Sequence, residues 1–349
     1  MTDQTSYEPT DLYDKANKLL EHALAEEFEG TQAKVGFELE QRITRAPGKD
    51  PALSESEVES IQTHLQQQTV DGIKPFKRFY SPDQLHLDEQ YETTTDALPV
   101  AQGVAAIRAY KEHCKEWLES GDLGIKDVTF EPIHEDKLDS SKDFISSLHS
   151  NVSFSKPDNT RSRRIPPSVI AMTLEALREN AALLIENAET YVGDRKRTFT
   201  HTDGHKNVHV AICLRENSET YTPYMELRVA DAQADPGALG MVTLLGIYLG
   251  LAHPEAAQTK DKVMWPSKTS TMVHWFKKST LLKDTLDELS SHYGDFCEKE
   301  GIPKGLGSLI HKTAVDQFKG PSPSMAEAID IDIPRIATFA PRGRQASGP

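Results

Sequence analysis

The sequence predicts an α+β fold, in which a curved sheet carries polar residues on its concave face and is backed by helices. Five segments have polar residues at every second position, which is the period of a strand. Around them, apolar residues recur with the 3.6-residue period of amphipathic helices. Solvated strand faces usually collect Thr, Lys and Ser, whereas these stripes include several carboxylates. They therefore favour a sheet whose concave face holds cations.

Composition and charge narrow the classes of function. The 349 residues include 39 Lys and Arg against 54 Asp and Glu, which gives a formal net charge of −15. A charge of this sign argues against a surface that binds nucleic acid or an anionic membrane. The N-terminus shows no signal-peptide pattern, and the most apolar run, residues 240–252, is too short to span a bilayer. Three widely spaced cysteines without a metal or redox pattern favour reduced thiols, so we expect a cytoplasmic protein.

The chain divides into three predicted parts. Apolar residues recur at helical spacing from residue 11 to about residue 28, and Gly30 stands where this helix would end. Residues 1–33 are therefore a predicted N-terminal helical extension. The polar stripes and the long helices fall within residues 34–320, the predicted main domain. Residues 321–349 are rich in Pro, Gly and Ser and predict a flexible tail.

The first predicted strand covers residues 34–43. Glu38 and Glu40 share one face of it, and the opposite face is apolar, with Val35, Phe37, Leu39 and Ile43. Two carboxylates on one side of a strand lie roughly 6.7 Å apart and repel each other unless water or cations screen them. The pair indicates either a solvated strand face or two carboxylates that each bind a divalent metal ion. The second interpretation requires further ligands from other strands.

The other strands carry the remaining polar stripes. One stripe consists of His86, Asp88, Gln90, Glu92 and Thr94. Three more segments with alternating polarity cover residues 148–154, 207–215 and 224–229. The side chains of chemical interest on these segments are His149, Asn151, Ser153, Glu226 and Arg228. Taken singly, His149 fits a hydrogen-bonded structural histidine, and Glu226 with Arg228 fits an ion-pair array. Together with the glutamates on the first two stripes, they fit a metal centre better.

Helices are predicted between and after the strands. Ser54 fits the N-cap of a helix that runs to about Gln68. The other predicted helices cover residues 98–118, 166–191, 240–252 and 281–299. The basic stretch 193–203 is predicted to be a loop.

The donor types in the stripes indicate the metal. Five side chains converge as candidate ligands: Glu38, Glu40, Glu92, His149 and Glu226. Carboxylate oxygens with one imidazole fit Mg²⁺ or Mn²⁺ better than Zn²⁺ with thiolates. Mg²⁺ works with substrate phosphates, which points to nucleotide chemistry. The sequence contains no Gly-rich phosphate-binding loop, so metals and basic side chains would have to hold any ATP.

The order and spacing of these motifs resemble the glutamine synthetases. The motifs that carry the resemblance are Gly36–Glu40, Gln90–Glu92, Leu148–Ser153 and Tyr224–Asp231, followed by Ala234–Pro236. The chain is similar to the catalytic domain of that superfamily, which also includes glutamate–cysteine ligases, over about residues 34–255 and more weakly to about 315. The resemblance implies a mainly antiparallel sheet that forms an open cup lined by carboxylates. It also implies an ATP-dependent ligase that joins an amino-acid-like carboxylate to an amine through an acyl phosphate.

The resemblance implies two metal sites. Glu38, His149 and Glu226 would hold the metal that meets the ATP phosphates, and Glu40 and Glu92 would hold the metal near the carboxylate and amine substrates. The implied catalytic residues are Glu226 and Arg228, of which Arg228 would neutralise phosphate charge. The expected nucleotide-binding residues are Asn151, Ser153, Arg195, Arg197 and Lys206. Taken alone, the last three most simply fit a solvated basic loop.

The chain also departs from the family pattern. Gln84 stands where the family carries a further glutamate, and the family's arginine-rich stretch is represented by residues 205–209. Only about 33 residues precede the first strand, so the family's small β-grasp domain is not expected here. An oligomer, if formed, would differ from the usual glutamine synthetase ring. Two alternatives stay open: a catalytically impaired metal- and nucleotide-binding relative that acts through partners, and a phosphotransferase similar to guanidino kinases.

Overall fold

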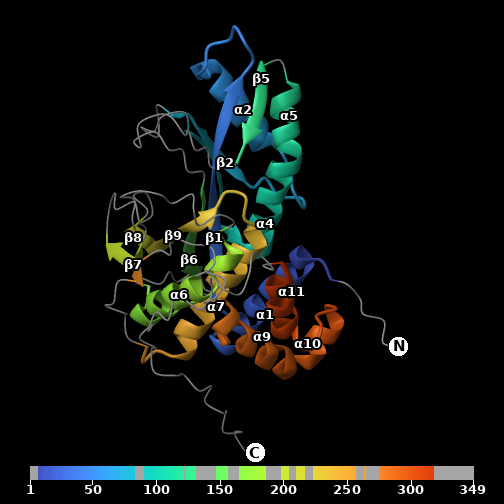
Figure 1. Ribbon diagram of the computed structural model, residues 1–349, viewed down its shortest axis with the longest axis vertical. Helices are drawn as coiled ribbons and strands as arrows, with labels where there is room; N and C mark the ends of the chain where they lie inside the picture. Colours follow the sequence, from blue (N-terminus) through green and yellow to red (C-terminus); the bar gives the residue numbers. More distant parts are fainter. Residues whose placement is uncertain are drawn as a thin grey trace, which may run out of the picture. The chain divides into compact units, whose positions relative to one another are not determined.

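The computed structural model describes most of the chain (Figure 1). The described residues are 7–82, 90–121, 123–130, 147–155, 165–185, 198–203, 210–216, 223–256, 263–264 and 276–317.

In the described part of the chain, ten strands form one sheet with the order β10-β7-β8-β9-β6-β1-β3-β2, and β4 and β5 also pair with β1. The strands are β1 Gln32–Arg45, β2 Phe76–Tyr80, β3 Gln90–Thr95, β4 Leu98–Pro99, β5 Ile125–Thr129, β6 Ser147–Ser155, β7 Thr198–Asp203, β8 Val210–Glu216, β9 Pro223–Asp231 and β10 Val263–Met264. Only the β7–β8 pair is parallel among these strands. The prediction of an α+β fold with a mainly antiparallel sheet is confirmed.

The helices include a central, largely apolar helix, α7. The α-helices are α1 Pro9–Glu27, α2 Glu55–Gln67, α4 Val100–Ala109, α5 Lys115–Ser120, α6 Pro167–Glu179, α7 Pro236–Ala252, α9 Leu281–His292, α10 Gly294–Lys299 and α11 Leu306–Gln317. Every residue of α7 from Pro236 to Gly250 is buried, and α7 packs against both α1 and α6 (Figure 1). None of the described helices combines the length and the hydropathy needed to cross a membrane.

Two glycines allow α6 and α7 to approach closely. A Cβ atom on Gly250 would lie 2.3 Å from the Cα atom of Val169, and one on Gly246 would lie 2.5 Å from the Cα atom of Thr173. These distances are far inside van der Waals contact, so only glycine fits at both positions. The glycines therefore set the spacing of the two helices.

Several predicted elements are present, and some have different boundaries. Ser54 caps α2 in a reciprocal capping box with Glu57, as its N-cap prediction requires. The helix predicted over residues 98–118 contains a π-helical turn, Tyr110–Cys114, between α4 and α5. The helix predicted over residues 281–299 is interrupted at Tyr293. Helix α11 has no counterpart in the prediction.

Two predictions in the middle of the chain are wrong. Helix α6 does not extend to Tyr191, because Asn180 leaves the helical conformation and its side-chain Nδ2 donates to the carbonyl of Ala176. A short 3₁₀ turn follows at Ala181–Leu183. Strand β7 lies where a basic loop was predicted, since its parallel pairing with β8 depends on tertiary contacts that local composition does not reveal.

Candidate metal centre

Strand register brings the predicted ligands together. On β1, Glu38 stands opposite His149 of β6, and Glu40 stands opposite Glu92 of β3. On the other side of β6, Asn151 stands opposite Glu226 of β9. Three neighbouring strands, β1, β6 and β9, therefore place carboxylate and imidazole groups at one level of the sheet.

A bulge in β9 lies beside this level. Ser150 pairs with Leu227 and Leu148 pairs with Ala230, so the two residues Arg228 and Val229 both stand opposite His149. An extra residue of this kind bends a strand and re-aims its side chains, and such bulges are common next to functional sites.

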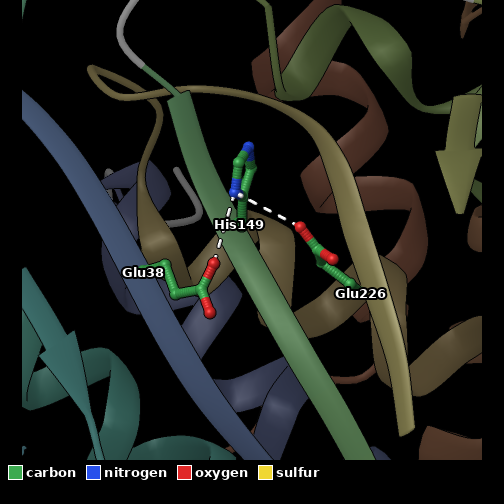
Figure 2. A group of neighbouring side chains, drawn as sticks. All are labelled: Glu38, His149 and Glu226. Carbon is green, nitrogen blue, oxygen red and sulfur yellow. Dashed lines mark ion pairs between the residues drawn. The ribbon is translucent and has the colours of Figure 1, made fainter. Parts of the chain in front are cut away.

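Glu38, His149 and Glu226 form the candidate metal centre (Figure 2). One ligand atom from each lies within 4.8 Å of the other two. His149 Nδ1 is 3.5 Å from Glu38 Oε2 and 3.8 Å from Glu226 Oε1. The side chains of His149 and Glu226 are only 4% and 3% exposed. A buried carboxylate such as that of Glu226 needs a partner, and a cation shared with the carboxylate of Glu38 would be one.

The donor set fits a divalent ion. It offers two carboxylates and one imidazole, which are ligands that Mg²⁺ and Mn²⁺ accept. His149 Nε2 and Asn151 Oδ1 are buried and make no hydrogen bond to the described residues. Such buried polar atoms are unusual in proteins and fit a site that is completed by a ligand.

The pKa values of two carboxyl groups show the electrostatics of the site. Burial alone would raise the pKa of Glu38, but His149, Asn151 and Arg215 outweigh it, so this pKa lies below its usual value. Asn151 Nδ2 donates to Glu38 Oε1 at 2.5 Å. Burial, followed by the negative charges of Glu38, Glu40 and other carboxylates, raises the pKa of Glu92 to about 9. The site therefore carries more negative charge than its protein groups neutralise.

Glu40 makes different contacts from Glu38. Its Oε2 atom accepts hydrogen bonds from the backbone N of Ser147 at 2.9 Å and from the Ser147 hydroxyl at 2.5 Å. Its Oε1 atom lies 3.9 Å from His149 Nε2. Glu40 and Glu92 thus border the centre. Whether a third ligand joins them depends on residues such as Gln84, His86 and Asp88, which lie outside the described residues.

Two arginines flank Glu226. Arg228 Nε lies 3.4 Å from Glu226 Oε1, and Arg215 Nε lies 2.5 Å from Glu226 Oε2. Arg228 was predicted from the sequence as a site residue, whereas Arg215 was not. Arg215 sits on β8, and its proximity to Glu226 follows from the register in which Cys213 stands opposite Glu226. The alternation of residues 207–215 already put Arg215 on the same side as Cys213, but the partner strand and its register were not known.

The predicted nucleotide-binding residues divide into two groups. Asn151 contacts the centre through Glu38, and Ser153 is half-buried on the same strand, opposite Lys34 of β1. The other three, Arg195, Arg197 and Lys206, lie outside the described residues, and their roles stay predictions.

Comparison with known proteins supports the fold. No protein-family model matches the chain, and no curated protein matches its sequence. Among solved structures, one described as a novel glutamine synthase homolog superimposes with a TM-score of 0.59 at 15% identity, covering 88% of this chain and 72% of the other. The structure of GmaS in complex with ADP superimposes with a TM-score of 0.57 at 13% identity, covering 90% of this chain and 77% of the other. At these identities the comparisons establish a shared fold.

Proposed function

We propose that this chain, whose fold is that of the glutamine synthetase catalytic domain, is an ATP-dependent ligase that joins a carboxylate to an amine and uses Mg²⁺ or Mn²⁺. The observation that carries the proposal is the centre of Glu38, His149 and Glu226 on the sheet of this fold, in which His149 and Glu226 are buried. The complex of GmaS with ADP, a structure with the same fold, supports a nucleotide as the second component.

The residues take separate roles in this proposal. Glu38, His149 and Glu226 hold one divalent ion, and Glu40 with Glu92 borders the position of a second. Bound ions would offset the charge of the phosphates and of the transferring phosphoryl group. Asn151 holds Glu38 in place through its hydrogen bond, and Arg228 adds positive charge beside Glu226.

The reaction follows the chemistry of acyl activation. An oxygen of the substrate carboxylate attacks the γ-phosphorus of ATP, which breaks the bond to ADP and gives an acyl phosphate. The nitrogen of the amine then attacks the acyl carbon, phosphate leaves, and the nitrogen loses a proton to give the amide. Positioning and charge stabilisation are the contributions of the protein in reactions of this type.

An ADP-release assay with pairs of amino-acid-like acids and amines tests the proposal. A ligase releases ADP only when acid and amine are both present, or slowly with the acid alone, and the amide appears by mass spectrometry. Glu38→Ala and Glu226→Ala should each abolish turnover, whereas Glu57→Ala, on helix α2, should not.

Other outcomes would contradict the proposal. ADP release with a phosphorylated acceptor and no amide would indicate the phosphotransferase. Nucleotide binding without turnover for any pair would indicate a relative that acts through partners. Full activity in both Glu38→Ala and Glu226→Ala would overturn the metal assignment.

A further inference from the structure

Arg215 is a charged residue of the site that has no role in the proposed reaction. It is the next-to-last residue of β8, and its side chain is 29% exposed, compared with 15% for Arg228 and 3% for Glu226. Its Nε atom makes the ion pair of 2.5 Å with Glu226 Oε2. Glu226 is at the same time one of the three groups of the candidate metal centre.

The charge of Arg215 also acts beyond this ion pair. It contributes to lowering the pKa of Glu38, after the larger effects of burial, His149 and Asn151, and it opposes the rise in the pKa of Glu92. Burial would lower the pKa of Arg215 itself, but Glu226 above all outweighs this and raises it. Arg215 therefore serves as a counter-cation for the acidic cluster.

A metal ion and Arg215 cannot both keep the same close contact with Glu226 without strong repulsion, because charges interact more strongly in a half-buried site than in water. His149 and Glu226 are buried side chains on paired strands, whereas the side chain of Arg215 is long and 29% exposed. Of these three groups, Arg215 therefore has the most room to change its conformation. An arginine beside a metal centre is also suited to phosphate, which a guanidinium binds with two parallel hydrogen bonds.

We propose that Arg215 couples metal binding to nucleotide binding. In the absence of a metal it neutralises Glu226, and when a divalent ion takes that carboxylate it turns to the anionic phosphates of the nucleotide. This inference rests on the proposed function, since it requires a metal at Glu226 and a nucleotide next to it. It assigns Arg215 a measurable linkage between the metal and the nucleotide.

The linkage predicts that one variant, Arg215→Gln, changes the affinities for metal and for nucleotide in opposite directions. Arg215→Gln removes the competing cation, so Mn²⁺ alone should bind about 10-fold more tightly than to the wild type, a typical size for coupling between sites. The same variant lacks the guanidinium that would bind phosphate. When Mn²⁺ is saturating, ADP and a non-hydrolysable ATP analogue should therefore each bind to it about 10-fold more weakly than to the wild type. An ion pair with only a structural role would weaken both ligands or neither.

Isothermal titration calorimetry and Mn²⁺ electron paramagnetic resonance measure these affinities without turnover. Arg45→Gln is the matched control, because Arg45 of β1 pairs with Glu57 of helix α2 at 2.7 Å and lies roughly 23 Å along β1 from Glu38. It should leave both affinities unchanged. Thermal melting establishes that each variant is folded.

A second variant keeps the inference testable if Arg215→Gln does not fold. Arg215→Lys retains the positive charge but loses the planar guanidinium, which can donate two parallel hydrogen bonds to a phosphate. The affinity for Mn²⁺ alone should therefore stay within about twofold of the wild type, while nucleotide binding weakens. Unchanged or weaker Mn²⁺ binding in folded Arg215→Gln would overturn the inference and leave the proposed function standing. Nucleotide binding by Arg215→Lys that is as tight as in the wild type, or an Mn²⁺ affinity that falls well beyond about twofold together with the nucleotide affinity, would have the same consequence. A wild type that binds no Mn²⁺, with or without nucleotide, would instead overturn the proposed function itself.

Discussion

Glu226 is the residue at which most charges of the site meet. Its carboxylate lies within 4.0 Å of His149, Arg215 and Arg228, and it is almost fully buried. A carboxylate in such a position is stable only because cationic groups surround it. The proposed metal binding and the folding stability of the metal-free chain therefore depend on the same residue.

Glu226→Gln should remove the stabilisation that Mg²⁺ gives to the folded chain. A ligand that binds only the folded state at about 100 times its Kd contributes about 2.7 kcal/mol. If the loss of this ligand weakens binding about 100-fold, the gain at the same Mg²⁺ concentration falls to about 0.4 kcal/mol. Denaturant unfolding with and without Mg²⁺ measures the difference. Glu57→Gln should keep the full gain, and an undiminished gain in Glu226→Gln would contradict the metal assignment.

Glu57 offers a separate test of electrostatics at the residue scale. Hydrogen bonds from Arg45, with smaller contributions from Ser54, outweigh the raising effect of burial and lower the pKa of Glu57 from 4.5 to about 2. A depressed pKa in the folded state adds stability above pH 4.5, and this stability is lost as the pH falls from about 4.5 towards 2.

Glu57→Gln removes this titration and keeps a side chain that the capping box accepts. The difference in unfolding free energy between the wild type and the variant should therefore shrink steadily between pH 4.5 and pH 2.5, as followed by urea unfolding. A difference that is constant with pH would contradict the role of the charged pair.

At the scale of elements, the packing of α6 on α7 depends on the absence of side chains. Gly250→Ala would force a Cβ atom to within 2.3 Å of the Val169 Cα atom, so the two helices would have to separate. Overpacking of this kind costs about 1–3 kcal/mol, and because the contact is with backbone we expect the upper part of that range.

Gly294→Ala is the matched control, because Gly294 begins α10 and no atom lies within 4 Å of the position that an alanine Cβ would take there. It should be neutral or slightly stabilising, since alanine reduces the entropy of the unfolded chain. Thermal unfolding of both variants checks the comparison. Equal stabilities would show that α6 and α7 are not held at this spacing.

Elements with local signals could be predicted from the sequence. The alternation of β1 and the capping box of α2 each lie within about ten residues, and both are present. The end of α6 at Asn180 and the strand β7 depend on side-chain and parallel-strand contacts that sequence patterns do not show. The same distinction holds at the site. Glu38, His149 and Glu226 stood out by residue type and alternation, whereas Arg215 required the β8–β9 register.

At the scale of the whole molecule, one arginine forms ion pairs with two parts of the chain that are far apart in sequence. Arg108 of α4 donates from Nη1 to both carboxylate oxygens of Asp14 on α1, and from Nη2 and Nε to Asp235. Asp235 in turn caps α7 by accepting a hydrogen bond from the backbone N of Gly237. Since β9 ends at Asp231, this network fixes the turn between the strand of Glu226 and the central helix.

Arg108→Met should therefore destabilise the whole fold. Its loss leaves two carboxylates without their cation, and since the Arg108 side chain is 22% exposed we expect a cost of about 2 kcal/mol, less than for a fully buried pair. Urea unfolding of Arg108→Met, Asp14→Asn and the double variant gives the coupling energy of the pair. Coupling below about 0.5 kcal/mol would show that the network is no stronger than an exposed ion pair. A coupled network predicts one cooperative transition in which the α1 and α7 regions lose protection from hydrogen exchange together.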